Sequence, residues 1–473
     1  MSPNPLRSIP SVNELLESPP LRRLVNRISH NVVVSTVRTV LEEMRTEVQN
    51  AASEMTLPSV TELAERIARR VLESETPGLQ PVINATGVLL HSALGWVPLA
   101  EEAVDEMAAV TRQYANVELD LASGQHRRQV QIAEGLLKEV SGAEAAVVVN
   151  SPASAMMLTL SALAAGREVV LSRGQLIETN DGCRLPELIA ASGAVLRAVG
   201  TLNRTRIDDY MHAVDEKTAA LLTVHLSNCV VVGGTTSPDL TELVEIGRRY
   251  RQPVIYDLGF GGMVDCASFG ISGEPIASAA IKAGADLILA SGDKLLGGPR
   301  CGLIAGRRAL IDQIQKHPLA RVVEADKMTL AALAGTLRLY RDPQRAQQAI
   351  PLLRLLDTSV ENLQNRAKRL TPQLAAADAV AEAEPIAGTN YLSGVPIPGH
   401  ELATWCVALK PAEMDVHHLD VALRLCRPPV VGCPKQDVLV LDLRSVIPRQ
   451  DMELVAAVDA VGHGQHVAMT SER

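Results

Sequence analysis

A lysine in a turn of small residues is the first candidate for chemistry in this sequence. Lys294 follows the apolar run of residues 286–291, and glycines and a proline follow it at 297–299. A lysine in such a turn is often an ordinary surface residue, and for Lys294 taken alone this interpretation stays open. The alternative is an amine that forms a Schiff base with pyridoxal phosphate (PLP), which requires a lysine of lowered pKa.

An aspartate earlier in the chain favours the second interpretation. Asp257 stands at the end of the apolar run that begins at Pro253. A PLP enzyme needs a carboxylate against the pyridinium nitrogen, because that charge makes the ring an electron sink. A single aspartate would more often be a turn residue or a helix cap. Together, Asp257 and Lys294 predict a PLP site.

A serine-rich stretch offers a place for the phosphate of such a cofactor. The apolar run 145–150 is followed by Ser151, Ala153 and Ser154, with a proline between the first two, and then by a helical pattern. A helix N-terminus presents free N–H groups and the positive end of a dipole to an anion, and proline is tolerated there. Ser151 can equally be a plain helix cap, and both roles are compatible. Ser291 could add a hydroxyl from the lysine turn.

His225 follows another apolar run and is a candidate for contact with the cofactor ring or its 3′-oxygen. A buried histidine with a purely structural role is an equally good interpretation. The sequence contains no H-E-x-x-H motif, no Walker loop and no cysteine–histidine cluster, so no metal site is expected.

The composition of the chain argues against a nucleic-acid-binding protein that relies on bulk positive charge or on aromatic stacking. The chain has 473 residues, 47% of them hydrophobic and only 2% aromatic, with a formal net charge of −9. Too few aromatic residues are present for a base-stacking platform, and nucleic acid could bind only through a local basic patch. Seven cysteines without a CxxC pair predict buried free thiols in a reducing compartment. We therefore expect a cytoplasmic protein without a signal peptide or a membrane span.

Three regions are expected from the hydrophobic pattern. Residues 1–78 predict a small helical N-terminal domain that begins with a capping box formed by Ser11 and Glu14. Residues 79–345 alternate short β-branched runs with helical stretches, which predicts a mostly parallel sheet covered by helices on both faces. Residues 346–473 predict a helix from Leu352 to Leu374 and then a smaller α+β domain. The expected strands of the middle region are 145–150, 168–172, 194–200, 219–225, 253–259 and 286–291.

With these motifs in their order, the chain resembles the bacterial selenocysteine synthase family, the L-seryl-tRNA(Sec) selenium transferases. The resemblance runs nearly end to end. It rests on INATGVLLHSALG (83–95), YANVELDLASG (114–124), LSRG (171–174), VHLSN (224–228), IYDLG (255–259), SGDKLLGGPRCGLI (291–304), DKMTLAALAGTLRLY (326–340) and LDLRSVIP (441–448).

The resemblance implies a fold-type-I PLP enzyme that assembles as a homo-oligomeric ring of dimers and contacts tRNA through its helical N-terminal domain. It places the PLP lysine at Lys294 and the pyridine-facing aspartate at Asp257. The implied reaction converts seryl-tRNA(Sec) to selenocysteyl-tRNA(Sec) through an aminoacrylyl intermediate, with selenophosphate as the selenium donor. Arg173 and Arg321 would meet the substrate or the anion.

Two departures from the family pattern leave a second function open. Trp96 and Glu324 stand where the family has arginines that serve the anionic donor. An indole and a carboxylate cannot replace the bidentate hydrogen bonding of guanidinium groups. The alternative is a divergent PLP-dependent lyase that acts on a small amino acid or amino sugar.

Overall fold

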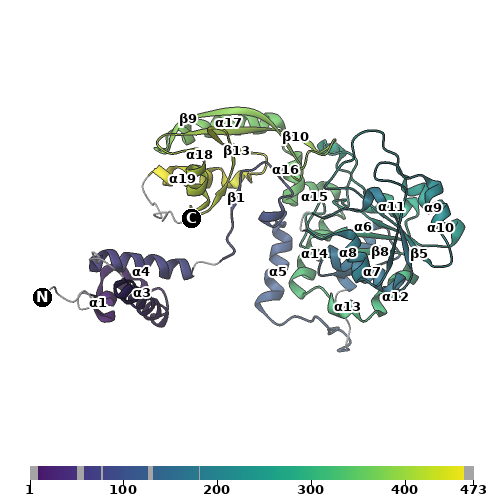
Figure 1. Ribbon diagram of the computed structural model, residues 1–473, viewed down its shortest axis with the longest axis horizontal. Helices are drawn as coiled ribbons and strands as arrows, with labels where there is room; N and C mark the ends of the chain where they lie inside the picture. The colour runs from purple at the N-terminus through teal and green to yellow at the C-terminus, as the bar shows by residue number, and fades with distance from the viewer. Residues whose placement is uncertain (1–8, 51–57, 76–77, 126–130, 180–181, 463–473) are drawn as a thin grey trace. The chain divides into compact units, whose positions relative to one another are not determined.

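The computed structural model describes residues 9–50, 58–75, 78–125, 131–179 and 182–462, and these form two compact units that divide after Pro81. The first unit is helical (Figure 1) and contains α1 (Val12–Glu17), α2 (Pro19–Val25), α3 (His30–Asn50) and α4 (Val60–Glu75). The predicted capping box is confirmed, since Ser11 and Glu14 hydrogen-bond reciprocally at the start of α1. The apolar faces of the four helices enclose one small core.

The second unit is built on a seven-stranded sheet, in agreement with the predicted α/β fold class. Its strands are β2 (Ala145–Val149), β3 (Glu168–Ser172), β4 (Val195–Val199), β5 (Thr218–Val224), β6 (Val254–Asp257), β7 (Leu287–Ser291) and β8 (Gly302–Gly306), in the order β2-β8-β7-β6-β5-β3-β4. All neighbours pair in parallel except β8, which is antiparallel to both β2 and β7. The six predicted strands are confirmed, whereas β8 was not predicted because its flanking glycines made it look like a continued turn.

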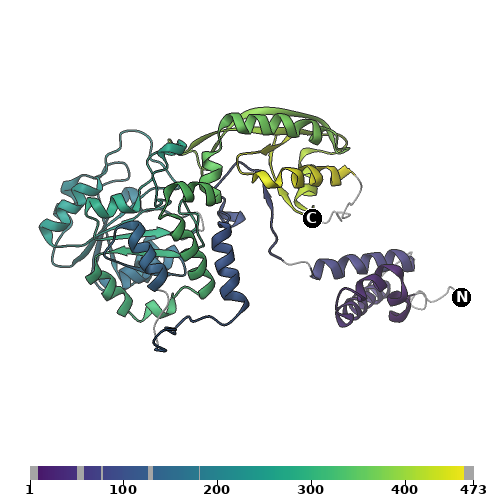
Figure 2. The ribbon, with the colours of Figure 1, turned by 180° about the vertical axis from the view of Figure 1, so that it is seen from behind.

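Helices cover both faces of this sheet, as Figures 1 and 2 show from opposite sides. Alternate residues of β2 point into two different cores, as expected for a strand buried on both faces. One face packs against α7 (Pro152–Ala164), α8 (Leu185–Ala191) and α12 (Arg308–Lys316). The other packs against α6 (Gln131–Ser141), α9 (Ile207–Ala213), α10 (Leu240–Tyr250), α11 (Ala277–Ala283) and α14 (Lys327–Leu339).

The C-terminal part of this unit carries a four-stranded antiparallel sheet. Its order is β12-β13-β10-β9, from β9 (Val380–Tyr391), β10 (Glu401–Pro411), β12 (Cys433–Lys435) and β13 (Val438–Asp442). It packs against α17 (Val360–Ala375), α18 (Val416–Arg424) and α19 (Asp451–Gly462). The helical region predicted from Leu352 to Leu374 is confirmed and consists of two helices, α16 (Pro351–Asp357) and α17, because Ser359 caps a new helix start.

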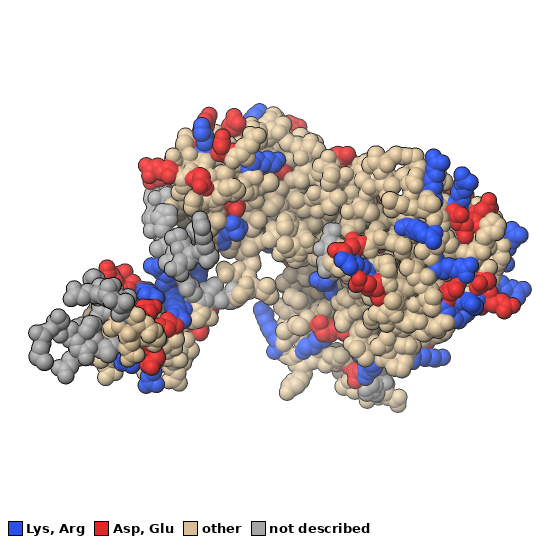
Figure 3. Space-filling view, viewed as in Figure 1, with Lys and Arg blue, Asp and Glu red and all other residues tan. Residues whose placement is uncertain are grey.

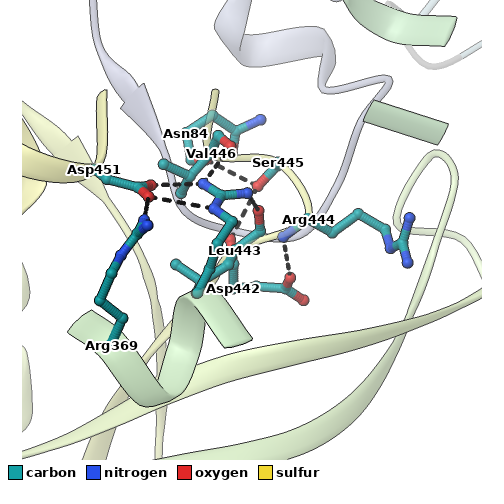
Figure 4. Close-up of polar contacts among 9 residues, drawn as sticks. Asn84, Arg369, Asp442, Leu443, Arg444, Ser445, Val446 and Asp451 are labelled. Carbon is teal, nitrogen blue, oxygen red and sulfur yellow. Dashed lines mark hydrogen bonds and ion pairs between the residues drawn. The ribbon is translucent and has the colours of Figure 1, made fainter. Parts of the chain in front are cut away.

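A buried ion pair fixes α17 to the chain that follows β13 (Figure 4). The Asp451 carboxylate accepts hydrogen bonds from Arg366 at 2.6 Å and from Arg369 at 2.6 Å. Arg366 also donates to the carbonyls of Leu443 and Val446, so its guanidinium is well satisfied. The Arg366 and Asp451 side chains are only 7% and 6% exposed. Each buried charge therefore has a partner of opposite sign.

Charged residues of both signs are interspersed on the face shown in Figure 3, with no stripe of a single sign. The described part of the chain contains no helix whose length and apolarity would suffice to span a membrane. All seven cysteines are free thiols, as predicted, but the expectation that they are buried holds only for Cys266, Cys301 and Cys406.

Candidate active site

The carboxyl ends of four strands meet at one edge of the seven-stranded sheet and surround a cavity of about 170 Å³. Ligands of open α/β sheets bind at this edge. The structure brings together most of the candidate residues here: Ser151, Ala153, His225, Asp257, Ser291 and Lys294 all line the cavity.

Asp257 ends β6 and is half-buried at the cavity wall, without a compensating cation. The N–H of Gly259 donates to its carboxylate at 3.0 Å, and no lysine or arginine pairs with it among the described residues. Burial raises the pKa of Asp257, and the Gly259 hydrogen bond and the nearby His225 offset only part of that effect. A carboxylate at a cavity wall without a paired lysine or arginine is suited to hold a positively charged ligand atom.

Lys294 lies in a rigid turn directly after β7. The Gly292 N–H donates to the Cys301 carbonyl at 2.9 Å and the Gly297 N–H donates to the Lys294 carbonyl at 2.8 Å. Gly292 is required here, because a Cβ at this position would lie 2.3 Å from the Pro299 carbonyl oxygen. The amine is therefore delivered to the cavity by a backbone with little freedom to move.

An aromatic wall covers the lysine amine. The Lys294 Nζ lies 2.7 Å from the centroid of the Trp96 ring and 5.2 Å from that of Phe260. The two rings pack edge to face with centroids 6.3 Å apart. Trp96 has a left-handed backbone, with φ of 68°, and its N–H donates to the His91 carbonyl. The residue that departs from the family pattern is thus in direct contact with the lysine amine.

The serine-rich stretch caps α7, as one of its two interpretations predicted. The Ser151 hydroxyl accepts from the Ser154 N–H at 3.1 Å and also contacts the Ser154 hydroxyl, which donates to Asn150. Ser151 and Ala153 line the cavity, whereas Ser154 is not among the lining residues. Ser291 was predicted to offer its hydroxyl to the phosphate of the cofactor. In the structure this hydroxyl already donates to the buried Asp293 at 2.5 Å.

The two arginines expected to meet the substrate or the anion do not line this cavity. Arg173 is exposed and donates to the Gly200 carbonyl at 2.6 Å. Arg321 is 61% exposed and forms ion pairs with Glu324 at 2.8 Å and Glu118 at 3.0 Å. These two carboxylates raise the pKa of Arg321 and neutralise its charge. Glu324 therefore pairs with Arg321 outside the cavity and offsets the positive charge of that arginine.

Several residues of the site were not predicted from the sequence. Arg300, six positions after Lys294, lines the cavity and adds a positive charge. Ser227 accepts from the Phe260 N–H at 2.8 Å and so fixes the wall next to Asp257. Glu274 contacts His225 from outside the cavity. The run GGPR in the lysine turn was the available signal for Arg300, whereas no local pattern marks Glu274.

The site fits PLP on the chemistry of its donors. An uncompensated carboxylate, a lysine amine, a helix N-terminus and a guanidinium surround one cavity. The carboxylate suits the pyridinium nitrogen of PLP and the lysine amine suits its aldehyde carbon. The helix N-terminus and the guanidinium suit its phosphate.

Comparison with known sequences identifies the family. The sequence model described as L-seryl-tRNA selenium transferase matches residues 82–447, and the one described as selenocysteine synthase N terminal matches residues 6–45. The L-seryl-tRNA(Sec) selenium transferase of Moorella thermoacetica is 42% identical over 468 residues, which cover 98% of this chain and 99% of the relative. That of Carboxydothermus hydrogenoformans is 40% identical over 445 residues, covering 94% and 95%.

A solved structure supports the fold. The D-glucosaminate-6-phosphate ammonia-lyase structure superposes with a TM-score of 0.57 at 20% identity, covering 82% of this chain and 96% of that one. The fold class is that of the fold-type-I PLP enzymes, as predicted. The extent of both family matches and the identity to full-length relatives show that this chain belongs to the L-seryl-tRNA selenium transferase family.

Proposed function

We propose that this protein is a PLP-dependent enzyme that converts seryl-tRNA(Sec) to selenocysteyl-tRNA(Sec) with selenophosphate as the donor. The observation that carries the proposal is the placement of the half-buried, uncompensated Asp257 and of Lys294 on one cavity, in a chain that matches this family over nearly its whole length. The names of the relatives support the aminoacyl-tRNA substrate.

Each group of the cavity has a role toward PLP in this proposal. Lys294 would carry the cofactor, Asp257 would pair with its pyridine nitrogen, and His225 would contact its ring. The first turn of α7, with Ser151 and Ala153, would hold the phosphate together with Arg300. Bound PLP supplies an electron sink, which allows loss of the α-proton and then of the β-hydroxyl from the serine ester.

Lys294 and the side chains around it would control the transfer of the substrate's α-proton. With its amine not bound to the cofactor, Lys294 would be in position to take the α-proton and to assist departure of the hydroxyl. Trp96 and Phe260 flank Nζ and exclude water from that side. Cation–π attraction holds the amine in place while it is protonated.

The donor anion requires a cationic contact. Among the described residues that line the cavity, the cationic side chains are those of Lys294 and Arg300. Arg321 stays a candidate, because the segment that carries it adjoins the cavity: Glu324 bridges to Val149 and the Asn150 N–H donates to the Val323 carbonyl. For this role Arg321 would have to exchange Glu118 or Glu324 for the donor.

The helical unit would meet the tRNA. Arg22, Arg23 and Arg27 are exposed on α2 and the turn that follows it, where guanidinium groups can contact phosphates. We further propose cytoplasmic localisation and assembly as a homo-oligomeric ring of dimers, both on the family resemblance. The domain limits 1–78, 79–345 and 346–473 are part of the same proposal.

One observation favours a second candidate, a PLP-dependent lyase acting on a small amino acid or amino sugar. Trp96 fills the space beside Lys294 where the family has an arginine, and Glu324 neutralises Arg321. Both changes reduce the positive charge available to an anionic selenium donor.

A single-turnover assay decides between the two. Seryl-tRNA(Sec) and selenophosphate are mixed with excess PLP-loaded protein, and selenocysteyl-tRNA is scored. We expect product within one turnover. No product, from protein whose visible PLP band shifts with a free amino acid, would overturn the proposal in favour of the lyase.

A further inference from the structure

A buried carboxylate links the cavity to the C-terminal sheet. The Glu274 side chain is 3% exposed, and its Oε1 lies 3.1 Å from Nε2 of His400 and 3.6 Å from Nε2 of His225. His400 is likewise 3% exposed, whereas His225 is 23% exposed because it lines the cavity. One carboxylate oxygen is thus shared by two imidazoles, and one of these belongs to the candidate active site.

The backbone holds these side chains in place from two directions. The Gly262 N–H donates to the Pro275 carbonyl and the Ala277 N–H to the Gly262 carbonyl, which fixes the segment that carries Glu274. The turn between β9 and β10 carries His400 and lies on the same segment, since the Ser272 N–H donates to the Gly399 carbonyl at 2.9 Å. Gly399 has φ of 84°, and a Cβ there would lie 2.3 Å from the Ser272 hydroxyl.

The electrostatics of the cluster depend on the two histidines. Neither Glu274 oxygen has a well-directed hydrogen bond within the described residues. Burial acts to raise the pKa of Glu274, but the contacts with His225 and His400 outweigh it and lower the pKa. The other titratable groups that face Glu274 are Tyr256 and Cys266. Burial, and secondly Glu274, raise the pKa of each to about 12, so both stay neutral.

We propose that Glu274 is a positioning residue that orients the His225 imidazole toward the cofactor, and that His400 holds Glu274 in place from the C-terminal hairpin. A carboxylate at Nε2 favours the ring with its proton on that nitrogen and restricts its rotation. The active-site histidine is then coupled to the position of the C-terminal sheet. The proposal rests on the PLP assignment made above and is independent of the identity of the selenium donor.

The test is a double-mutant cycle between Glu274 and His225, with PLP as the probe. Glu274→Gln removes the charge and keeps the shape, and His225→Gln removes its target. The measurements are the Kd of PLP and the pH dependence of the visible absorption band. We expect Glu274→Gln to weaken PLP binding roughly tenfold and to shift the pH midpoint by about one unit. In the His225→Gln background the same change should have almost no further effect.

Two further variants separate positioning from folding. Glu274→Asp should recover part of the wild-type pH profile, and His400→Gln should shift it in the same direction as Glu274→Gln by a smaller amount. Glu401→Gln is the matched control, because Glu401 begins β10 directly after His400 and accepts from the Gly399 N–H at 2.7 Å, with no contact to His225. It should match the wild type.

Additive losses in the cycle would overturn the proposal. So would a Glu274→Gln protein that has a lower melting temperature together with wild-type PLP affinity and pH profile. If Glu274→Gln fails to fold, an unchanged pH profile in His400→Gln would likewise assign the cluster to the fold alone. A wild type that binds PLP and transfers no selenium would refute the selenium transferase and leave this test intact.

Discussion

Two carboxylates of this molecule, Asp451 and Asp257, differ in what surrounds them. Asp451 accepts hydrogen bonds from Arg366 and Arg369, and its region is satisfied without any ligand. Asp257 is half-buried at the cavity wall and has one backbone N–H and a nearby histidine. A buried charge with its counter-charge in the chain serves the fold, whereas one without it serves a ligand. The difference supports the proposed cofactor site at Asp257.

Loss of the lysine amine is the largest effect expected in the cavity. Lys294→Ala removes both the attachment point and the proton carrier, so selenium transfer should fall at least ~10⁴-fold. The melting temperature of the cofactor-free protein should stay close to that of the wild type. Rate measurements with saturating PLP check this, and a variant that retained a tenth of the wild-type rate would remove Lys294 from the mechanism.

Removal of the satisfied carboxylate should damage the fold instead. Asp451→Ala leaves Arg366 buried and unpaired, which should lower the free energy of unfolding by about 3–5 kcal/mol. Denaturant titration measures the loss, and the rate per folded molecule should be unchanged at a temperature where the variant is folded. If Asp451→Ala lost PLP affinity without losing stability, Asp451 would belong to the cofactor site and the contrast with Asp257 would be wrong.

Neutralising Asp257, which has no paired cation, should lower the reaction rate and leave the stability of the fold intact, the opposite of the result expected for Asp451→Ala. Asp257→Asn should lower the rate roughly 10²–10³-fold, or about 3–4 kcal/mol in barrier height, because the ring loses its counter-charge. In the cofactor-free protein it should not destabilise. Since burial raises the pKa of Asp257, the stabilising effect of its neutral form is present at acidic pH and is lost as the pH rises through the raised pKa.

The cofactor-free Asp257→Asn protein should therefore melt at or above the wild-type temperature at neutral pH. The two should converge below the ordinary carboxyl range, where the wild-type aspartate is also neutral. Melting curves across this pH range check the sign. A variant that is less stable than the wild type at neutral pH would show that Asp257 is satisfied after all.

The smallest effect is expected at the exposed arginine. Glu324→Ala frees Arg321 from one of its two carboxylates, so the KM for selenophosphate should fall severalfold if Arg321 meets the donor. Exposed ion pairs contribute little to stability, so the melting temperature should not change measurably. Glu139→Ala is the matched control, because it breaks a similar exposed ion pair, with Arg341, that does not involve Arg321. An unchanged KM in Glu324→Ala would remove Arg321 from donor binding.

Sequence patterns were sufficient for the centre of this site. Asp257 and Lys294 follow successive apolar strands, and parallel strands bring their carboxyl ends to one edge, so their proximity could be predicted. Glu274 and His400 could not be paired in this way. They lie in loops 126 positions apart, and their contact depends on how the β9–β10 turn packs against residues 272–275. The antiparallel strand β8 was missed because glycines stand at both of its ends and glycine is depleted in strands.

The most direct measurement of the central claim is the site of covalent attachment. PLP-loaded protein is reduced with borohydride and digested, and the modified lysine is mapped by mass spectrometry. The account predicts pyridoxyl modification at Lys294, with the label lost in Lys294→Ala and weakened in Asp257→Asn. Modification at another lysine, or wild-type protein that takes up no PLP, would contradict it.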